Sequence, residues 1–326
     1  MIKKVFPFFL CLIMFVACNK KDSSTATTKF SVVTTNFMCY DLARAVCGNG
    51  NAQKNKIFSG MLPTATDLQM ILKPGTDLHS FDPSPKDIIA IENADIFIFT
   101  GGESDEWAKK LLKTLKNPPT KVFSLIENLD LITDEHENCT TEHQHEEKHH
   151  HENDEHVWTS PANTLKLIDL LETALSECNP ANKENYHINA GIYKNEIENA
   201  GNAIRNVLAT KQKPLIVMGD RFPLQYFAQE FNIKYYAAFA GCSSAVEASP
   251  ATIAKLVDII KEEDLPAVFT IELSNRRIAK TIAESTGVKV LELNAAHNLT
   301  QMQFDAEMTY IDTLYANANA LDAGLR

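Results

Sequence analysis

The chain has 326 residues, of which 44% are hydrophobic and 22% are charged, and its formal net charge is −11. That length is enough for two domains of about 100 to 200 residues each. Nucleic acids and anionic membrane surfaces both recruit clustered lysine and arginine, so the acidic balance excludes them as the expected partners.

The N-terminus is typical of a bacterial secretion signal. Two lysines precede the apolar stretch 5–17, which is too short to span a bilayer. The letters Phe-Val-Ala-Cys that end at Cys18 resemble a lipobox, so we predict a signal peptide over 1–17, lipidation of Cys18 and a flexible tether over 18–28. We therefore expect an extracytoplasmic protein, lipid-anchored to the bacterial cell membrane. An ordinary cleaved signal with an incidental cysteine is the alternative.

Residues 29–178 alternate between strands and helices. Short runs rich in β-branched and aromatic residues are each followed by a helical pattern. The predicted strands are 30–35, 96–100 and 122–125, and the predicted helices are 39–47, 85–93 and 106–115. This alternation is typical of a parallel sheet covered by helices on both faces, and it predicts an N-terminal α/β lobe.

One segment of this lobe concentrates histidine. Seven of the chain's ten histidines lie between residues 136 and 156. Residues 134–155 also carry nine acidic residues against one lysine, a net −8 of the chain's −11. Imidazole is the commonest protein ligand of zinc, and carboxylates raise the local cation concentration. We interpret 134–155 as a disordered loop that collects metal, although a merely charged loop is the alternative. Its accessory histidines are His136, His143, His145, His149, His150 and His151.

The second half of the chain begins with a long helical pattern. Apolar residues recur at steps of three or four and predict one linking helix over 179–209, about 45 Å long at 1.5 Å per residue. Two helices broken near Gly191 or Gly201 are the alternative. A second α/β lobe over 210–326 is predicted from strands at 215–218, 233–236, 267–271 and 288–293 and helices at 250–263 and 275–286.

Three histidines lie at or near the ends of predicted sheet elements, where open α/β folds place their sites. His79 follows a Pro-Gly turn in a proline-rich loop, and His297 follows the last strand. His156 ends the acidic run beside Val157 and Trp158, where the chain re-enters the fold. One such histidine would more often be structural, but three together indicate a metal site.

The chain resembles a known family, the solute-binding lipoproteins of bacterial ABC importers for zinc and manganese (metal-binding cluster A-I). The blocks DLHSFDPSPKDIIAIENADIFIFTGG and EHVWTSPAN are similar to those around the family's first two histidine ligands, and AVFTIELSNRRIAKTIAESTGVKVLELN is similar to its final βαβ unit. The resemblance covers almost the whole mature chain. It implies two doubly wound α/β lobes joined by a rigid interdomain helix, with metal in the cleft between them. It also implies a monomeric carrier that hands its metal to a membrane permease and is not an enzyme.

The resemblance also implies a ligand set. His79 and His156 match the first two positions, and His297 falls on the fourth. The third falls on Asp220 or Arg221; we prefer Asp220 because a guanidinium has no lone pair to offer, although a structural role explains Asp220 equally well. A nitrogen-rich, closed tetrahedral set favours Zn²⁺ as cargo over Mn²⁺, which takes more oxygen ligands.

The main alternative from another class is a zinc metallohydrolase. His145, Glu146 and His149 match the HExxH pattern, in which two histidines bind zinc and the glutamate is the general base. The flanking residues offer no apolar face to bury such a helix, so we interpret the match as chance. A surface adhesin is a further reading that does not exclude metal carriage.

Cysteine use does not indicate a disulfide framework. The five cysteines beyond the signal have no CxxC spacing, and buried free thiols are expected. They are Cys39, Cys47, Cys139, Cys178 and Cys242.

Overall fold

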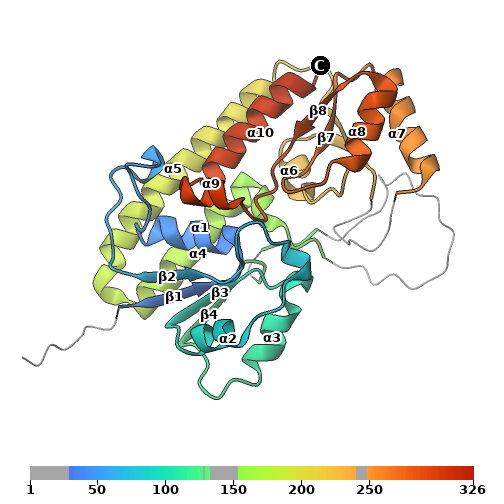
Figure 1. Cartoon of the computed structure of the whole chain (residues 1–326). Helices are drawn as coiled ribbons and strands as arrows, with labels where there is room; N and C mark the ends of the chain where they lie inside the picture. Colours follow the sequence, from blue (N-terminus) through green and yellow to red (C-terminus); the bar gives the residue numbers. More distant parts are fainter. Residues whose placement is uncertain (1–28, 128, 133–152, 240–247) are drawn as a thin grey trace, which may run out of the picture.

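The computed structural model describes residues 29–127, 129–132, 153–239 and 248–326. Each of two lobes contains a four-stranded parallel sheet, and long helices run between them (Figure 1). The predicted fold class, two parallel α/β lobes joined by a long helix, is confirmed. Among the described residues, no helix is both long and apolar enough to cross a membrane.

The N-terminal sheet has the strand order β2-β1-β3-β4. Its strands are β1 (Ser31–Thr34), β2 (Asp67–Met70), β3 (Ile96–Phe99) and β4 (Lys121–Ser124). Alternate side chains of the central strand β3 enter two different cores, with Ile96 and Ile98 on one face and Phe97 and Phe99 on the other. Burial on both faces explains why this strand is apolar throughout.

Helices cover both faces of this sheet. α1 (Phe37–Val46) begins at Asn36, whose side chain accepts a hydrogen bond from the backbone N–H of Cys39. α2 (Pro85–Glu92) begins with a capping box between Ser84 and Asp87, and α3 (Glu106–Leu112) is three residues shorter than predicted. α2 and α3 lie on the outer face, away from the second lobe (Figure 1).

The C-terminal sheet repeats the same topology, with the order β6-β5-β7-β8. Its strands are β5 (Leu215–Met218), β6 (Lys234–Ala237), β7 (Ala267–Thr270) and β8 (Lys289–Glu292). Its helices are α6 (Gln225–Glu230), α7 (Pro250–Glu262) and α8 (Arg277–Thr286). In both lobes the connections are βα units, which bring the carboxyl ends of the four strands to one edge.

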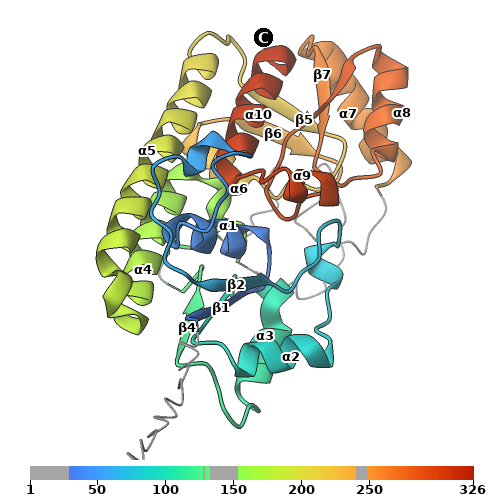
Figure 2. The same ribbon diagram turned by 60° about the vertical axis from the view of Figure 1, so that its left-hand side comes forward.

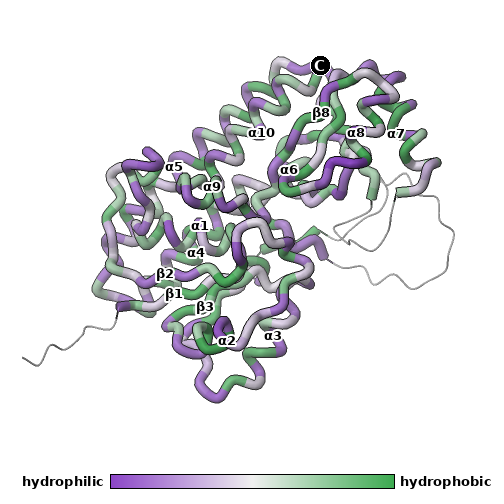
Figure 3. Tube along the Cα trace, in the orientation of Figure 1, coloured by the Kyte–Doolittle hydropathy of each residue, from purple (hydrophilic) through white to green (hydrophobic). Residues whose placement is uncertain are grey.

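Four further helices lie between or beside the sheets. They are α4 (Pro161–Cys178), α5 (Lys183–Leu208), α9 (Gln301–Asp305) and α10 (Tyr310–Gly324). α5 is a single helix of 26 residues, about 39 Å long, and is not broken at Gly191 or Gly201. It lies beside α10 along much of its length (Figure 2), and hydrophobic and hydrophilic residues alternate along it (Figure 3), as expected of a helix with one buried face.

One hydrophobic core joins the two lobes. It contains residues of β3 and β7 together with α1, α4, α5 and α10. Within this layer the buried carboxylate of Asp41 accepts hydrogen bonds from Arg44, from the Tyr193 hydroxyl and from the backbone N–H of Tyr310. Because Asp41, Tyr193 and Tyr310 belong to α1, α5 and α10, these bonds tie the N-terminal lobe to the helices that continue into the second lobe.

Candidate metal centre

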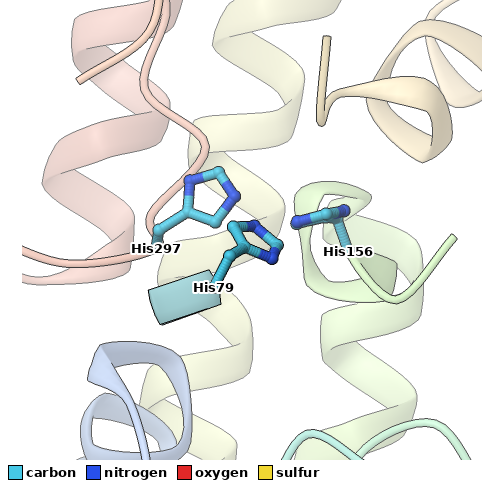
Figure 4. Close-up of side chains that lie close together, drawn as sticks. All are labelled: His79, His156 and His297. Atoms are coloured by element: carbon cyan, nitrogen blue, oxygen red, sulfur yellow. The ribbon is translucent and has the colours of Figure 1, made fainter. Parts of the chain in front are cut away.

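Three histidines from distant parts of the chain converge between the lobes. One ring nitrogen from each of His79, His156 and His297 lies within 4.8 Å of the others. The ring centroids of His156 and His297 are 4.8 Å apart, and that of His79 is 5.7 Å and 5.8 Å from them. The three side chains come from separate segments and their rings lie close together, tilted or edge-on to one another (Figure 4). This is the one group of three or more potential metal ligands among the described residues.

His79 lies in a short 3-10 turn that follows β2. The Asp77 carboxylate caps this turn by accepting a hydrogen bond from the His79 backbone N–H at 2.9 Å. The buried Asn298 amide, next to His297, donates to the carbonyl oxygens of Lys73 and Thr76 at 2.8 and 2.9 Å. The loop that carries His79 is therefore fastened to the opposite lobe beside another site histidine.

His156 is almost fully buried. The Asp154 Oδ1 atom accepts from the His156 backbone N–H at 2.9 Å and lies 2.6 Å from its Nδ1. The following Trp158 packs edge-on against His156, with ring centroids 5.3 Å apart, and donates its indole N–H to the Ala295 carbonyl at 2.7 Å. The indole thereby links the His156 segment to the His297 segment.

His297 follows β8 and is held by Glu272, which follows the neighbouring strand β7. Glu272 Oε1 accepts from the His297 backbone N–H at 2.9 Å and lies 2.8 Å from its Nδ1, while Oε2 accepts from the Ala295 N–H at 2.8 Å. Burial alone would raise the pKa of Glu272, but the charge and hydrogen bonds of His297 outweigh it and hold that pKa below its usual value. A buried negative charge therefore lies behind this histidine.

Glu155 connects His79 to its own lobe. Its Oε1 lies 3.6 Å from His79 Nδ1, and its Oε2 accepts from the backbone N–H and hydroxyl of Ser104 at 3.1 and 2.9 Å. A Cβ at Gly102 would lie 2.0 Å from Oε2, so only glycine fits there. His79 has the weakest carboxylate contact of the three histidines and is also the most exposed, at 20% of its side chain.

The structure does not bring Asp220 into this group. One of its oxygens accepts from the Arg221 backbone N–H, and the other from the hydroxyls of Thr270 and Ser274. The carboxylate thus anchors the loop after β7. The six accessory histidines, Cys18 and the His145-Glu146-His149 motif lie outside the described residues.

The three carboxylates behind the histidines were not predicted from the sequence. Asp154 and Glu155 were counted with the acidic run 134–155, yet both are buried at 6% and 5% exposure. Both precede His156 and the apolar pair Val157 and Trp158, and this position was the signal in the sequence that could have indicated their burial. Glu272 carries no comparable signal beyond its place directly after a buried strand.

The arrangement suits a borderline divalent cation. A carboxylate at Nδ1 leaves Nε2 of the same neutral imidazole to bind metal, and neutral imidazoles are preferred ligands of zinc. The cysteines among the described residues take no part in this group. Cys39, Cys47 and Cys178 are free thiols, and burial raises the pKa of Cys39 and of Cys47 to about 12. Cys139 and Cys242 lie outside the described residues.

Comparison with known proteins identifies the family. The protein-family model described as ZnuA, zinc-uptake complex component A periplasmic, matches residues 32–324. The zinc-binding lipoprotein AdcA of Streptococcus pneumoniae R6 is 29% identical over 96% of this chain, which spans only 58% of AdcA. The high-affinity zinc uptake system protein ZnuA of Bacillus subtilis 168 is 26% identical over 98% of this chain and 97% of its own length. The crystal structure of the Zn(II)-bound ZnuA-like domain of S. pneumoniae AdcA superposes with a TM-score of 0.71 and 25% identity, covering 90% of this chain and 98% of that domain. The chain belongs to the ZnuA family of periplasmic zinc-uptake components.

Proposed function

We propose that this protein is the extracytoplasmic zinc-binding component of an ABC importer. It captures Zn²⁺ between its lobes and delivers the ion to a permease in the membrane. The observation that carries this proposal is the convergence of His79, His156 and His297 from three separate segments of the chain. The zinc-related names of its relatives support the choice of cargo, and membership of a family of solute-binding transport proteins supports carriage rather than catalysis.

The ligand set favours zinc over manganese. Three imidazoles give a nitrogen-rich site, whereas manganese sites keep more oxygen ligands. We propose His79, His156 and His297 as ligands. Asp220, expected as the fourth, would have to exchange its hydrogen bonds with Thr270 and Ser274 for the metal. Lipidation of Cys18, membrane anchoring and a monomeric state complete the proposal.

Metal titration of the purified protein tests the proposal. We expect one tightly bound zinc per chain, and a loss of that tight binding in His79→Ala, His156→Ala and His297→Ala. His187→Ala is the matched control, because His187 also contacts a carboxylate, that of Glu172 at 3.0 Å, but lies exposed on α5. Tight zinc binding that survives all three site substitutions would refute this assignment of the site.

Two cellular measurements separate the alternatives. Deletion of the gene should lower zinc uptake without abolishing attachment to surfaces, whereas an adhesin would show the reverse. Zinc-dependent hydrolysis that is abolished by Glu146→Gln would support the metallohydrolase reading.

A further inference from the structure

We propose that Glu272 and Asp154 are positioning residues of the zinc site and that the two are not equivalent. Replacing Glu272 by glutamine lowers the affinity for zinc strongly, whereas replacing Asp154 by asparagine lowers it less. This inference rests on the proposed function, since it concerns how His297 and His156 are prepared for the metal. Each carboxylate meets the Nδ1 atom of one histidine, at 2.8 Å for Glu272 and 2.6 Å for Asp154.

The environment of Glu272 demands two accepting oxygens. One oxygen receives the backbone N–H and the ring Nδ1 of His297, and the other receives the backbone N–H of Ala295. Backbone N–H groups only donate, so an amide NH₂ on either side would face a donor. A glutamine at this position must therefore abandon either Ala295 or His297, within a buried site.

The environment of Asp154 requires only one accepting oxygen. Its Oδ1 receives both the backbone N–H and the ring Nδ1 of His156, while its buried Oδ2 has no hydrogen-bond partner among the residues that the structure describes. An asparagine can keep its oxygen at the Oδ1 position and direct its NH₂ away from His156. The same amide substitution therefore has different consequences behind the two histidines.

The role of both carboxylates is to fix the ring before the metal arrives. A carboxylate that accepts from Nδ1–H selects the tautomer in which Nε2 carries the free lone pair. Glu272 also holds the backbone near His297, because it accepts from the N–H groups of Ala295 and His297, on either side of Ala296. Ala296 adopts a left-handed conformation with φ of +58°. Such a conformation is costly for alanine and persists only where the surroundings enforce it.

Two measurements on Glu272→Gln and Asp154→Asn test the inference. The first is zinc affinity by competition with a chelator, for which we expect a loss of about 10- to 100-fold in Glu272→Gln and a smaller one in Asp154→Asn. The second is the protonation of the ring nitrogens in the metal-free protein, by ¹⁵N–¹H correlation of labelled histidines above the pKa range of imidazole. We expect His297, identified by the signal lost in His297→Asn, to carry its proton on Nδ1 in the wild type and to lose this preference in Glu272→Gln.

The outcomes are distinguishable from failure of the proposed function. If the wild type binds no zinc tightly, the proposed function fails. If the wild type binds zinc and Glu272→Gln keeps both the zinc affinity and the His297 tautomer, the positioning role is overturned. It is also overturned if Asp154→Asn lowers the zinc affinity more than Glu272→Gln does. Glu307→Gln is the control, because this carboxylate accepts a hydrogen bond from Arg44 and contacts none of the described histidines. Should Glu272→Gln fail to fold, Glu272→Asp decides. Its shorter carboxylate still accepts on both oxygens but withdraws from the ring, so unchanged affinity and tautomer would again overturn the role.

Discussion

The guanidinium of Arg221 lies 3.5 Å from the carboxylate of Asp77, measured from Nη2 to Oδ2, and so joins the C-terminal lobe to the loop that carries His79. Asp77 also caps the turn that contains His79, by accepting a hydrogen bond from the His79 backbone N–H. Burial alone would raise the pKa of Asp77, but this hydrogen bond and the charge of Arg221 outweigh burial and hold that pKa below its usual value. The ion pair is partly exposed, which limits its contribution to about 1 kcal/mol.

We predict that Asp77→Asn accelerates zinc dissociation by up to about fivefold, because it removes the charge and can keep the cap hydrogen bond. Arg221→Met should have a similar effect, and combining the two should add little. Stopped-flow transfer of zinc to a chelator measures the rate. Slower dissociation in Arg221→Met would instead indicate that the guanidinium chiefly repels the bound cation.

Asp220→Ala should retain one zinc per chain, with an affinity within about tenfold of the wild type. The reason is that the Asp220 carboxylate anchors Thr270 and Ser274, so its loss loosens the loop after β7 rather than removing a ligand. Calorimetric titration measures both quantities. Disappearance of tight binding, with folding intact by circular dichroism, would identify Asp220 as the fourth ligand.

Removal of residues 133–152 should leave the tight site at one zinc per chain. His156 and its partner Asp154 lie beyond this segment, and the other two histidines come from separate loops. We expect only weak additional zinc binding to be lost, which equilibrium dialysis at high zinc concentration can measure. Loss of the tight site would mean that the histidine-rich run contains a primary ligand.

The stability of the metal-free protein should depend on the ionisation of Asp105. Burial, and then the nearby Glu155 carboxylate, raise the pKa of Asp105 to about 7, whereas an unfolded aspartate titrates near 3.9. The folded state therefore binds this proton more tightly. That stabilisation is complete below about pH 4 and is lost as the pH rises through about 7.

Asp105→Asn cannot ionise and should escape this loss. Relative to the wild type, its free energy of unfolding should increase by about 2 to 3 kcal/mol between about pH 5 and about pH 8. Urea denaturation of both proteins at the two pH values measures the difference. A difference that does not change with pH would show that Asp105 is ionised throughout.

Zinc binding should change the overall shape very little. The core that includes α5 and α10 is continuous through both lobes, so a wide hinge motion would expose buried apolar surface. We expect the radius of gyration to change by no more than about 1 Å, against about 20 Å for a compact chain of this length. Small-angle X-ray scattering with and without zinc measures it, and a larger change would contradict a stiff connection.

The elements that the sequence predicted are those whose signal is local. Buried strands such as β3 and β7 are apolar on both faces, and α5 has a regular apolar stripe. The edge strand β2 was not predicted, because its alternately exposed and half-buried residues lack that signal. The helices α4 and α10 were also missed; their apolar faces are buried against α5 by tertiary packing.

By itself the sequence determined the two α/β lobes, the long helix between them and the choice of the three histidines, because each depends on residues close together in the chain. Only the tertiary structure decided which carboxylates stand behind those histidines. Glu272 and His297 are separated by 25 positions and meet because β7 and β8 are neighbours in a parallel sheet. The role of Asp220 was decided in the same way, by hydroxyl groups on the adjacent strand and loop rather than by its own neighbours in sequence.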